Sequence, residues 1–127
     1  MRALSVRQPW AWAIIHAGKD IENRTWRTHY RGEVAIHASS KMDENARLPK
    51  GSLKPSEEDL LFSEIIGLVD LVDVVESSRS KWFGGSFGYV LTNPRPLSKP
   101  IPCKGALGIW NVPLEIERLI RRRLPKD

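Results

Sequence analysis

The segment GKDIENRTWRTHYRG, residues 18–32, concentrates side chains that can bind a polar, anionic ligand. A guanidinium binds phosphate or a base edge through paired hydrogen bonds, and a carboxylate accepts hydrogen bonds from base amino groups. An aromatic ring such as Trp26 or Tyr30 stacks on an unpaired base. The segment therefore predicts one wall of a nucleic-acid-binding cleft.

Within this segment, Glu22 and Arg24 are two residues apart on an expected strand at residues 20–26. Alternate strand residues share a face, so the two side chains project together. They either hold a ligand jointly or form a structural ion pair, and both alternatives stay open. Lys19 stands at the end of the preceding helix, from where it can reach a phosphate.

Residues outside the segment can join the same cleft. Arg7 and Gln8 leave the first expected strand, and His37 and Ser39 end the strand after the segment. His37 lies between two apolar residues, so a structural role is as consistent with its position as a functional one. The sequence thus predicts a binding set of Arg7, Gln8, Lys19, Glu22, Arg24, Trp26, Arg27, Tyr30, Arg31, His37 and Ser39.

Other kinds of reactive site find little support in the sequence. His16, His29 and His37 lack a metal-ligand spacing such as HExxH, and Cys103 is the only cysteine, so we predict no metal and no cofactor. No local general base accompanies Cys103, which predicts an inert thiol. Residues 83–88, FGGSFG, lack the GxxxxGK[ST] pattern of a phosphate-binding loop.

Length and composition predict a single domain spanning residues 1–127. The chain is 41% hydrophobic and 28% charged, which is typical of a globular protein with one core. No apolar run approaches the roughly 20 residues of a membrane-spanning helix. Arg7 and Pro9 interrupt the region where an export signal would be apolar. We therefore expect a cytoplasmic protein without a membrane partner.

Charge is distributed unevenly along the chain. The net charge is +4 over residues 1–41, −5 over residues 42–80 and +6 over residues 81–127. Two basic ends that meet in space would form one basic face, which suits an anionic partner such as nucleic acid.

The elements that must position these residues follow from periodicity and from turn residues. Pro9 suits the first turn of a helix and Gly18 suits its end. Gly67 indicates a bulge or a close backbone approach within the most β-branched strand. We expect strands at 3–7, 20–26, 33–39, 65–77, 89–97 (ending at its prolines) and 105–112, helices at 8–19 and 113–124, and a surface excursion at 40–62 with one or two short helices, one of them capped by Ser56. In the last helix, Leu114, Ile116, Leu119 and Ile120 are expected to face inward.

Three stretches carry a family resemblance: LSVRQPWAWAIIHAGKDIENRTWRTHYRGEVAIHAS (4–39), IIGLVDLVDVV (65–75) and FGYVLTNPRPLSKPIPCKGALGIWNVP (87–113). In this order and spacing they resemble the ASCH domain family of the PUA-like superfamily, over nearly the whole chain. The resemblance implies an α+β fold, a small PUA-like β-barrel of five to six strands flanked by short helices. It also implies a cleft lined by residues 18–32 and a role in RNA binding or RNA-related chemistry.

Two functions follow from this resemblance. The first is binding of single-stranded RNA or a modified nucleoside, by a monomer or a weak dimer. The second is metal-independent hydrolysis, because one ASCH-like branch hydrolyses N-acetylated cytidine with a lysine, a threonine and a glutamate, and other members are linked with RNA cleavage. Lys19 matches the lysine by its spacing to Arg24, whereas Glu22 occupies the threonine position; Glu64 and Glu76 flank the central strand. Any catalysis would then use Lys19, with Glu22 either orienting it or holding a substrate amino group.

Overall fold

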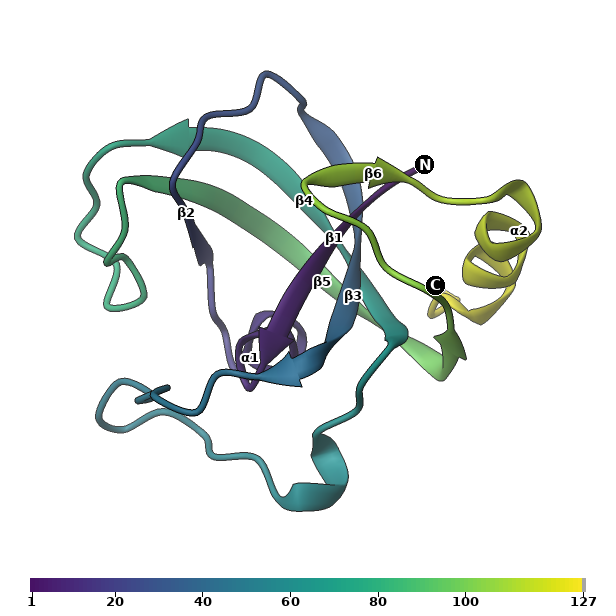
Figure 1. Cartoon of the computed structure of the whole chain (residues 1–127), viewed down its shortest axis with the longest axis horizontal. Coiled ribbons are helices and arrows are strands. Elements are labelled where there is room, and N and C mark those ends of the chain that lie inside the picture. The colour runs from purple at the N-terminus through teal and green to yellow at the C-terminus, as the bar shows by residue number, and fades with distance from the viewer. Residues whose placement is uncertain (127) are drawn as a thin grey trace.

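The computed structural model describes residues 1–126, which form a curved six-stranded sheet with two α-helices (Figure 1). The elements are β1 (Arg2–Gln8), α1 (Trp10–His16), β2 (Ile21–Arg24), β3 (Gly32–Met42), the 3-10 helix η1 (Glu57–Asp59), β4 (Glu64–Val75), β5 (Phe87–Pro102), β6 (Ile109–Asn111) and α2 (Leu114–Arg123). The strand order is β2-β5-β4-β3-β1-β6, with only β1 and β3 parallel. The expected α+β class is confirmed.

The sheet is not closed into a barrel by hydrogen bonds. Within the described residues its two edges, β2 and β6, do not pair with each other. Instead, the Arg24 side chain crosses from β2 to β1, where its Nη2 donates to the main-chain oxygen of Ser5 at 2.9 Å. The expected barrel is therefore an open, curved sheet with a seam between β2 and β1.

Each helix covers its own hydrophobic cluster. Ala11, Ile14 and Ile15 of α1 pack among apolar side chains of β1, β3, β4 and β5. Ile120 of α2 is fully buried in a second cluster, with Ile116 and Leu119 partly buried beside it. Leu114, expected to face inward, is 59% exposed. This correction follows from its position as the first residue of α2, before the helix reaches the sheet.

Strand β5 continues through the prolines at which it was expected to end. β2 pairs only with Phe87–Val90, so residues 91–102 of β5 pair on one side, with β4. A proline lacks the N–H that a ladder needs, but on a free edge no partner requires it. Edge position thus explains how Pro96 continues the strand opposite Gly67.

The bulge expected at Gly67 is confirmed. The β3–β4 register shifts next to it, and so does the register between β4 and β5. A Cβ atom at Gly67 would stand 2.6 Å from Ile15 Cδ1 and 2.8 Å from the main-chain oxygen of Arg95. Glycine therefore allows α1 and β5 to approach the centre of the sheet.

The excursion between β3 and β4 contains one short helix within the described residues, η1. Ser56 is the N-cap of this helix as expected, and its N–H donates to Asp59 Oδ2 at 2.9 Å. No helix within residues 1–126 is long and apolar enough to cross a bilayer.

Candidate functional site

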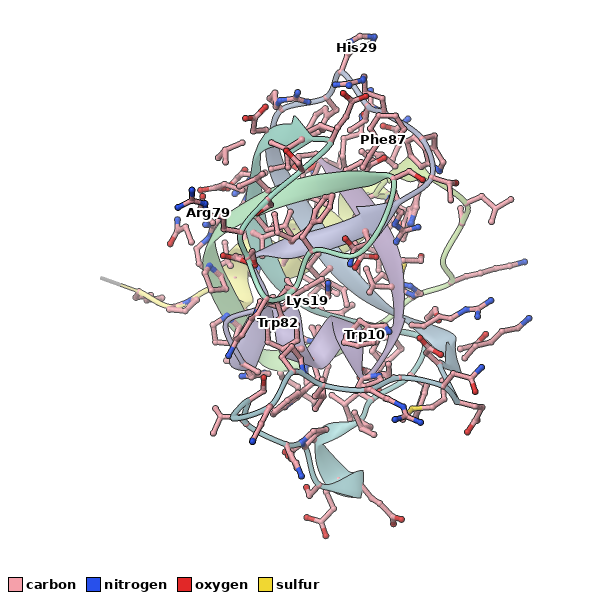
Figure 2. All side chains as sticks on the ribbon, turned by 90° about the vertical axis from the view of Figure 1, so that its left-hand side faces the viewer. Trp10, Lys19, His29, Arg79, Trp82 and Phe87 are labelled. Carbon is pink, nitrogen blue, oxygen red and sulfur yellow. The ribbon has the colours of Figure 1, made fainter. Side chains whose placement is uncertain are left out.

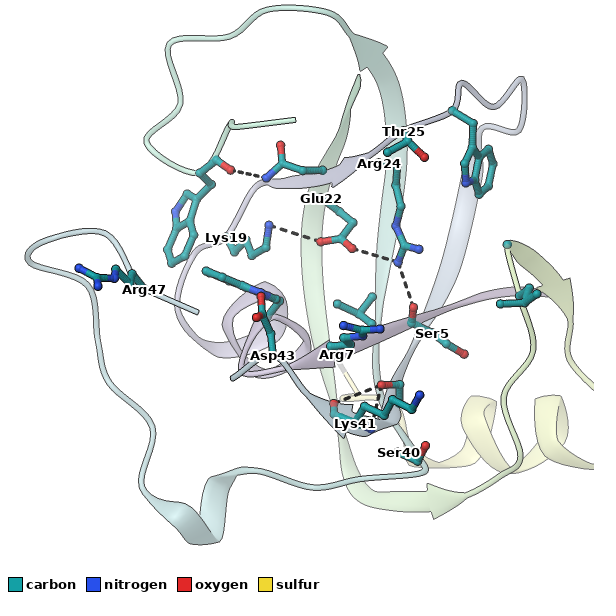
Figure 3. Close-up of a pocket in the computed structure, with 18 of the residues that line it drawn as sticks. Ser5, Arg7, Lys19, Glu22, Arg24, Thr25, Ser40, Lys41, Asp43 and Arg47 are labelled. Atoms are coloured by element: carbon teal, nitrogen blue, oxygen red, sulfur yellow. Dashed lines mark hydrogen bonds and ion pairs between the residues drawn. The ribbon is translucent and has the colours of Figure 1, made fainter. Parts of the chain in front are cut away.

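A cleft of about 820 Å³ lies along the seam between β2 and the end of β1, which Figure 3 shows in close-up. β2 forms one wall, and loops after β3, β4 and β5 complete the others. The residues that line it are Ser5, Val6, Arg7, Trp10, Lys19, Glu22, Asn23, Arg24, Thr25, Trp26, Ser39, Ser40, Lys41, Asp43, Arg47, Pro49, Lys81, Trp82, Ala106, Leu107 and Gly108.

Three charged side chains form a row across the floor of the cleft (Figure 3). Glu22 Oε1 lies 3.4 Å from Lys19 Nζ, and Glu22 Oε2 lies 3.0 Å from Arg24 Nη2. Arg24 continues the row to the main-chain oxygen of Ser5. The β2 alternation thus brings Glu22 and Arg24 together as predicted, in an ion pair that also lines the cleft.

Lys19 is a buried cation between two indole rings. It is 4% exposed, and its Nζ lies 5.4 Å from the Trp10 ring centroid and 5.9 Å from that of Trp82. Figure 2 shows Trp82 and Trp10 on either side of Lys19. Burial lowers the pKa of Lys19 below its usual 10.5, and the Glu22 carboxylate partly opposes this shift.

The turn after α1 places Lys19 in this position. The N–H groups of Ala17 and Lys19 both donate to the main-chain oxygen of Ala13, at 3.0 and 3.1 Å. Gly18 between them has φ +74°, in the left-handed region that favours glycine. The lysine side chain then donates to the main-chain oxygen of Ile21 at the start of β2.

Trp82 reaches the cleft because Asn23 of β2 holds its loop. The Asn23 amide donates to the main-chain oxygen of Trp82 at 2.9 Å. Its Oδ1 accepts from the N–H groups of Gly84 and Gly85, at 2.9 and 3.1 Å. Three hydrogen bonds from one side chain therefore fix a loop that is about 60 residues away in sequence.

Trp10 is held by the loop after β3. Its Nε1 donates to Asp43 Oδ2 at 2.9 Å, and this hydrogen bond lowers the pKa of Asp43. The N–H of Asp43 in turn donates to the main-chain oxygen of Gln8 at 2.7 Å. The loop that continues from here brings Arg47 to the rim of the cleft.

At the opposite rim, Trp26 offers an exposed ring. It is 39% exposed, and one edge packs at a right angle to the Tyr89 ring, with centroids 5.7 Å apart. The Tyr89 hydroxyl donates to the main-chain oxygen of Trp26 at 2.9 Å. The ring is thereby held in place while its free surface faces the cleft.

The structure brings six of the predicted site residues to the cleft: Arg7, Lys19, Glu22, Arg24, Trp26 and Ser39. Gln8 does not line the cleft and is fully buried. Its Oε1 accepts from the Trp12 N–H and its Nε2 donates to the main-chain oxygen of Leu61, both at 2.9 Å. Its amide fixes α1 to the excursion instead of facing a ligand.

Arg27, Tyr30 and Arg31 do not line the cleft either. Arg27 stacks over Phe87 and pairs with Glu76 at 3.1 Å. The Tyr30 hydroxyl donates to the main-chain oxygen of Glu33 at 2.7 Å, and Arg31 donates to the main-chain oxygens of Thr28 and Tyr30. The chain leaves the cleft after Trp26, so these side chains serve the β2–β3 connection.

His37 also lies outside the cleft. It is 2% exposed and hydrogen-bonded through both ring nitrogens, to Ser5 Oγ and to the main-chain oxygen of Cys103. Burial lowers its pKa below 6.5. It lines a smaller neighbouring pocket instead.

Sequence reasoning missed part of the cleft: Trp10, Asn23, Asp43, Arg47, Lys81 and Trp82. Trp10 follows the apolar spacing of α1, which is typical of a core residue, and it does pack against core residues beside the cleft. Lys81 and Trp82 are an adjacent cation and aromatic ring in a Gly- and Ser-rich loop, and this was the one feature of the sequence that could have indicated a binding role for the loop. Because Trp82 is 59 positions from Asn23, nothing in the sequence indicated that this loop contacts β2.

Both basic segments of the chain contribute cations to the cleft: Arg7, Lys19, Arg24 and Lys41 from residues 1–41, and Lys81 from residues 81–127. α2 packs on the second cluster and contributes no residue that lines the cleft within residues 1–126. Arg121 pairs with Glu33 at 2.7 Å, and Arg123 donates to the main-chain oxygen of Pro100 at 3.1 Å. The cations of the helix therefore brace the sheet from another side.

Neither flanking glutamate of the central strand joins Lys19, because Glu64 and Glu76 do not line the cleft. Within the described part of the chain, no three His, Cys, Asp or Glu side chains are grouped as a metal site.

Three comparisons relate this chain to known proteins, two by sequence and one by structure. A family model of the ASCH domain matches residues 4–98. The chain is 27% identical to activating signal cointegrator 1 of Mus musculus and of Homo sapiens, over 98% of its own length and 24% of theirs. It thus spans about a quarter of these curated relatives. The crystal structure of ASCH from Zymomonas mobilis superposes with a TM-score of 0.58 at 13% identity, covering 98% of this chain and 96% of that one.

Proposed function

The chain belongs to the ASCH domain family, and from this premise we propose that it binds single-stranded RNA or a modified nucleoside in the cleft between β1 and β2. The observation that carries the proposal is the combination of cations, indole rings and one buried carboxylate along a single seam. Each of these groups recognises a different part of a nucleotide.

The phosphates would lie at the rim of the cleft. Arg7, Lys41, Arg47 and Lys81 are exposed cations that line it, and cations of this kind bind the backbone without regard to sequence. Because they are exposed, they supply attraction rather than a fixed geometry.

The base would stack on the exposed ring of Trp26, with its polar edge toward the charged row. Glu22 uses one oxygen for Lys19 and one for Arg24, and a carboxylate has about four acceptor positions in all. It therefore keeps acceptor capacity for an exocyclic amino group, while Arg24 can donate to a neighbouring base oxygen. This polarity favours a base that carries both a donor and an acceptor, as cytosine does.

Fluorescence anisotropy with a labelled, unstructured RNA of about ten nucleotides tests the proposal. Trp26→Ala should weaken binding by about 1–3 kcal/mol if the ring stacks a base. Arg47→Ala should weaken binding and also reduce its dependence on salt, since fewer counterions are released. Arg31→Ala is the matched control, because this cation lies outside the cleft and is expected to leave affinity unchanged.

Two outcomes would contradict the proposal. The first is that neither the RNA nor free cytidine nucleotides bind to the protein at low salt. The second is equal weakening by Arg31→Ala and Arg47→Ala, which would mean that general surface charge, not the cleft, attracts the RNA.

One observation favours hydrolysis as a second candidate function. Burial lowers the pKa of Lys19 beside Glu22, and a lysine with a lowered pKa can act as a general base. Incubation with N4-acetylcytidine, and separately with unstructured RNA, tests this with and without EDTA. Product formed by the wild type and lost in Lys19→Met would support catalysis; equal yields from both proteins would rule out Lys19 as the base.

A further inference from the structure

A second group of polar side chains lies beside the cleft, where β1 and β3 run parallel. Ser5 is the register partner of His37 in this pair of strands. Ser5 Oγ lies 3.0 Å from His37 Nδ1, and His37 Nε2 lies 2.6 Å from the main-chain oxygen of Cys103. Trp110 Nε1 lies 3.1 Å from Ser5 Oγ. The proposed RNA site uses none of these side-chain atoms.

The chemistry of the partners fixes every proton in this chain of hydrogen bonds. A carbonyl oxygen only accepts, so His37 Nε2 must carry a proton and donate it to Cys103. In the neutral ring, Nδ1 is then an acceptor. An indole N–H only donates, so Ser5 Oγ accepts from Trp110 and directs its own proton to His37 Nδ1. The serine hydroxyl therefore donates to a histidine oriented by a third group, the arrangement of an activated nucleophile.

The pair opens onto a side pocket of about 450 Å³ with a mainly apolar lining. The side pocket shares Ser5, Ser39, Ser40, Ala106 and Leu107 with the cleft and adds His37, Ser63, Lys104 and Gly105. Its size and lining suit a short acyl chain better than a phosphate. A lysine ammonium such as that of Lys104 can stabilise negative charge that develops on a carbonyl oxygen.

Gly105 lies directly against the Ser5 and His37 side chains. A Cβ atom at this position would stand 2.5 Å from Ser5 Oγ and 2.6 Å from His37 Cε1. The Cβ atom of any other residue would therefore clash with both the Ser5 hydroxyl and the His37 ring. Glycine avoids this clash and keeps both side chains in their hydrogen-bonded positions.

We propose that Ser5 is a nucleophile, activated by His37 and oriented through the Cys103 carbonyl, and that the side pocket accepts small carboxylic esters. This activity is separate from RNA binding and does not depend on it. It is also separate from Lys19, whose ammonium belongs to the row in the cleft.

The reaction follows from the hydrogen bonds. Ser5 Oγ forms a bond to the ester carbonyl carbon while its proton passes to His37 Nδ1. The carbon–oxygen bond to the alcohol then breaks, and the alcohol leaves with that proton. Water attacks the acyl-serine and gives a proton to Nδ1, the acid departs, and Ser5 Oγ regains its proton from His37. Throughout, the Cys103 carbonyl holds Nε2–H and steadies the transient imidazolium.

His37 is ready to accept this proton at neutral pH. Burial lowers its pKa below 6.5, so the ring is neutral in the folded protein. The exposed histidines of the chain, His16 and His29, have no such serine partner among the described contacts, and His29 points into solvent in Figure 2.

The direct test needs no mutation. The intact protein is incubated with a fluorophosphonate probe, which forms a phosphorus–oxygen bond with an activated serine and releases fluoride. We expect one adduct per chain, located on Ser5 by peptide mass spectrometry and lost when the protein is unfolded in urea. Absence of an adduct on the folded protein, or modification of another residue, would overturn the proposal.

Hydrolysis of p-nitrophenyl acetate provides the second readout. Ser5→Ala and His37→Gln should each reduce the protein-dependent rate by about a hundredfold or more, the usual contribution of a positioned base and nucleophile. Ser98→Ala is the control, since this serine is exposed on β5 outside both pockets, and it should keep the wild-type rate. Equal rates in the wild type and Ser5→Ala would refute the nucleophile. Because a buried histidine is replaced, circular dichroism must first show that His37→Gln is folded; if it is not, the adduct on the wild type decides.

Discussion

Replacing Glu22 with glutamine tests whether the row of charges holds the cleft together. The carboxylate lies between two cations, 3.4 Å from Lys19 Nζ and 3.0 Å from Arg24 Nη2. Glutamine keeps the size of the side chain and removes only the charge. Lys19, at 4% exposure, would then be a buried ammonium without the counter-ion that contacts it.

The expected loss in the free energy of unfolding is about 3–5 kcal/mol. Coulomb's law gives about 5 kcal/mol for unit charges at the Lys19–Glu22 separation with an effective dielectric constant of about 20. Removal of one partner from buried ion pairs typically costs about 3–5 kcal/mol, because the remaining charge has no compensation. A domain of this size is stable by about 5–15 kcal/mol, so the variant should fold with reduced stability.

Urea unfolding followed by tryptophan fluorescence measures this loss, because the Trp10 and Trp82 rings flank the ammonium. The double variant Lys19→Met/Glu22→Gln should recover much of the stability, since it contains no unpaired buried ammonium. Glu76→Gln is the matched control: it breaks an exposed pair with Arg27 and should cost less than about 1 kcal/mol.

The pH dependence gives a further check. Burial lowers the pKa of Lys19 in the fold, so between that value and 10.5 the unfolded chain binds more protons and stability rises with pH. Without the carboxylate the pKa falls further, so the cost of Glu22→Gln should shrink as the pH is raised from 7 toward 10. A loss under 1 kcal/mol at pH 7, or one that does not change with pH, would refute the ion-pair reasoning.

Two other predictions concern the packing of the sheet and the neutral histidine. Gly67→Ala should lower the urea midpoint by an amount equivalent to about 1–3 kcal/mol, because the new methyl group would meet Ile15 and the main-chain oxygen of Arg95; an unchanged midpoint would contradict the close approach. The pKa of His37 is lowered by burial, so its neutral form is favoured in the fold and stability should fall as the pH drops below about 6.5 toward the folded-state pKa. Titration of the His37 ring protons by NMR should give a midpoint below 6.5, and a midpoint above that value would contradict the assignment.

Local sequence determined most of the elements and one wall of the cleft. The alternation at residues 20–26 placed Glu22 and Arg24 on one face, and β2 from Ile21 to Arg24 bears this out. Pro9 and Gly18 marked the ends of α1, and Gly67 marked the bulge. These features depend on backbone preferences and on contacts within a few residues, which a short window of sequence contains.

Some residues that are close to the cleft residues in sequence do not line the cleft in the structure. Arg27 and Arg31 follow Trp26 closely, yet the chain turns away and their charges pair elsewhere. Gln8 adjoins Arg7, yet its amide is consumed by main-chain groups of α1 and of the excursion. In a strand, adjacent residues face opposite ways, so closeness in sequence does not ensure a shared site.

Only the tertiary structure decided the rest of both sites. Asn23 holds Trp82 from 59 positions away, and Cys103 orients His37 from 66 positions away. Such contacts depend on strand order, register and the curvature of the whole sheet. These properties are set by the joint packing of the core, so no single segment encodes them. The sequence alone therefore determined which side chains could do chemistry near β2, while the fold determined which partners lie within hydrogen-bonding distance of Lys19 and Ser5.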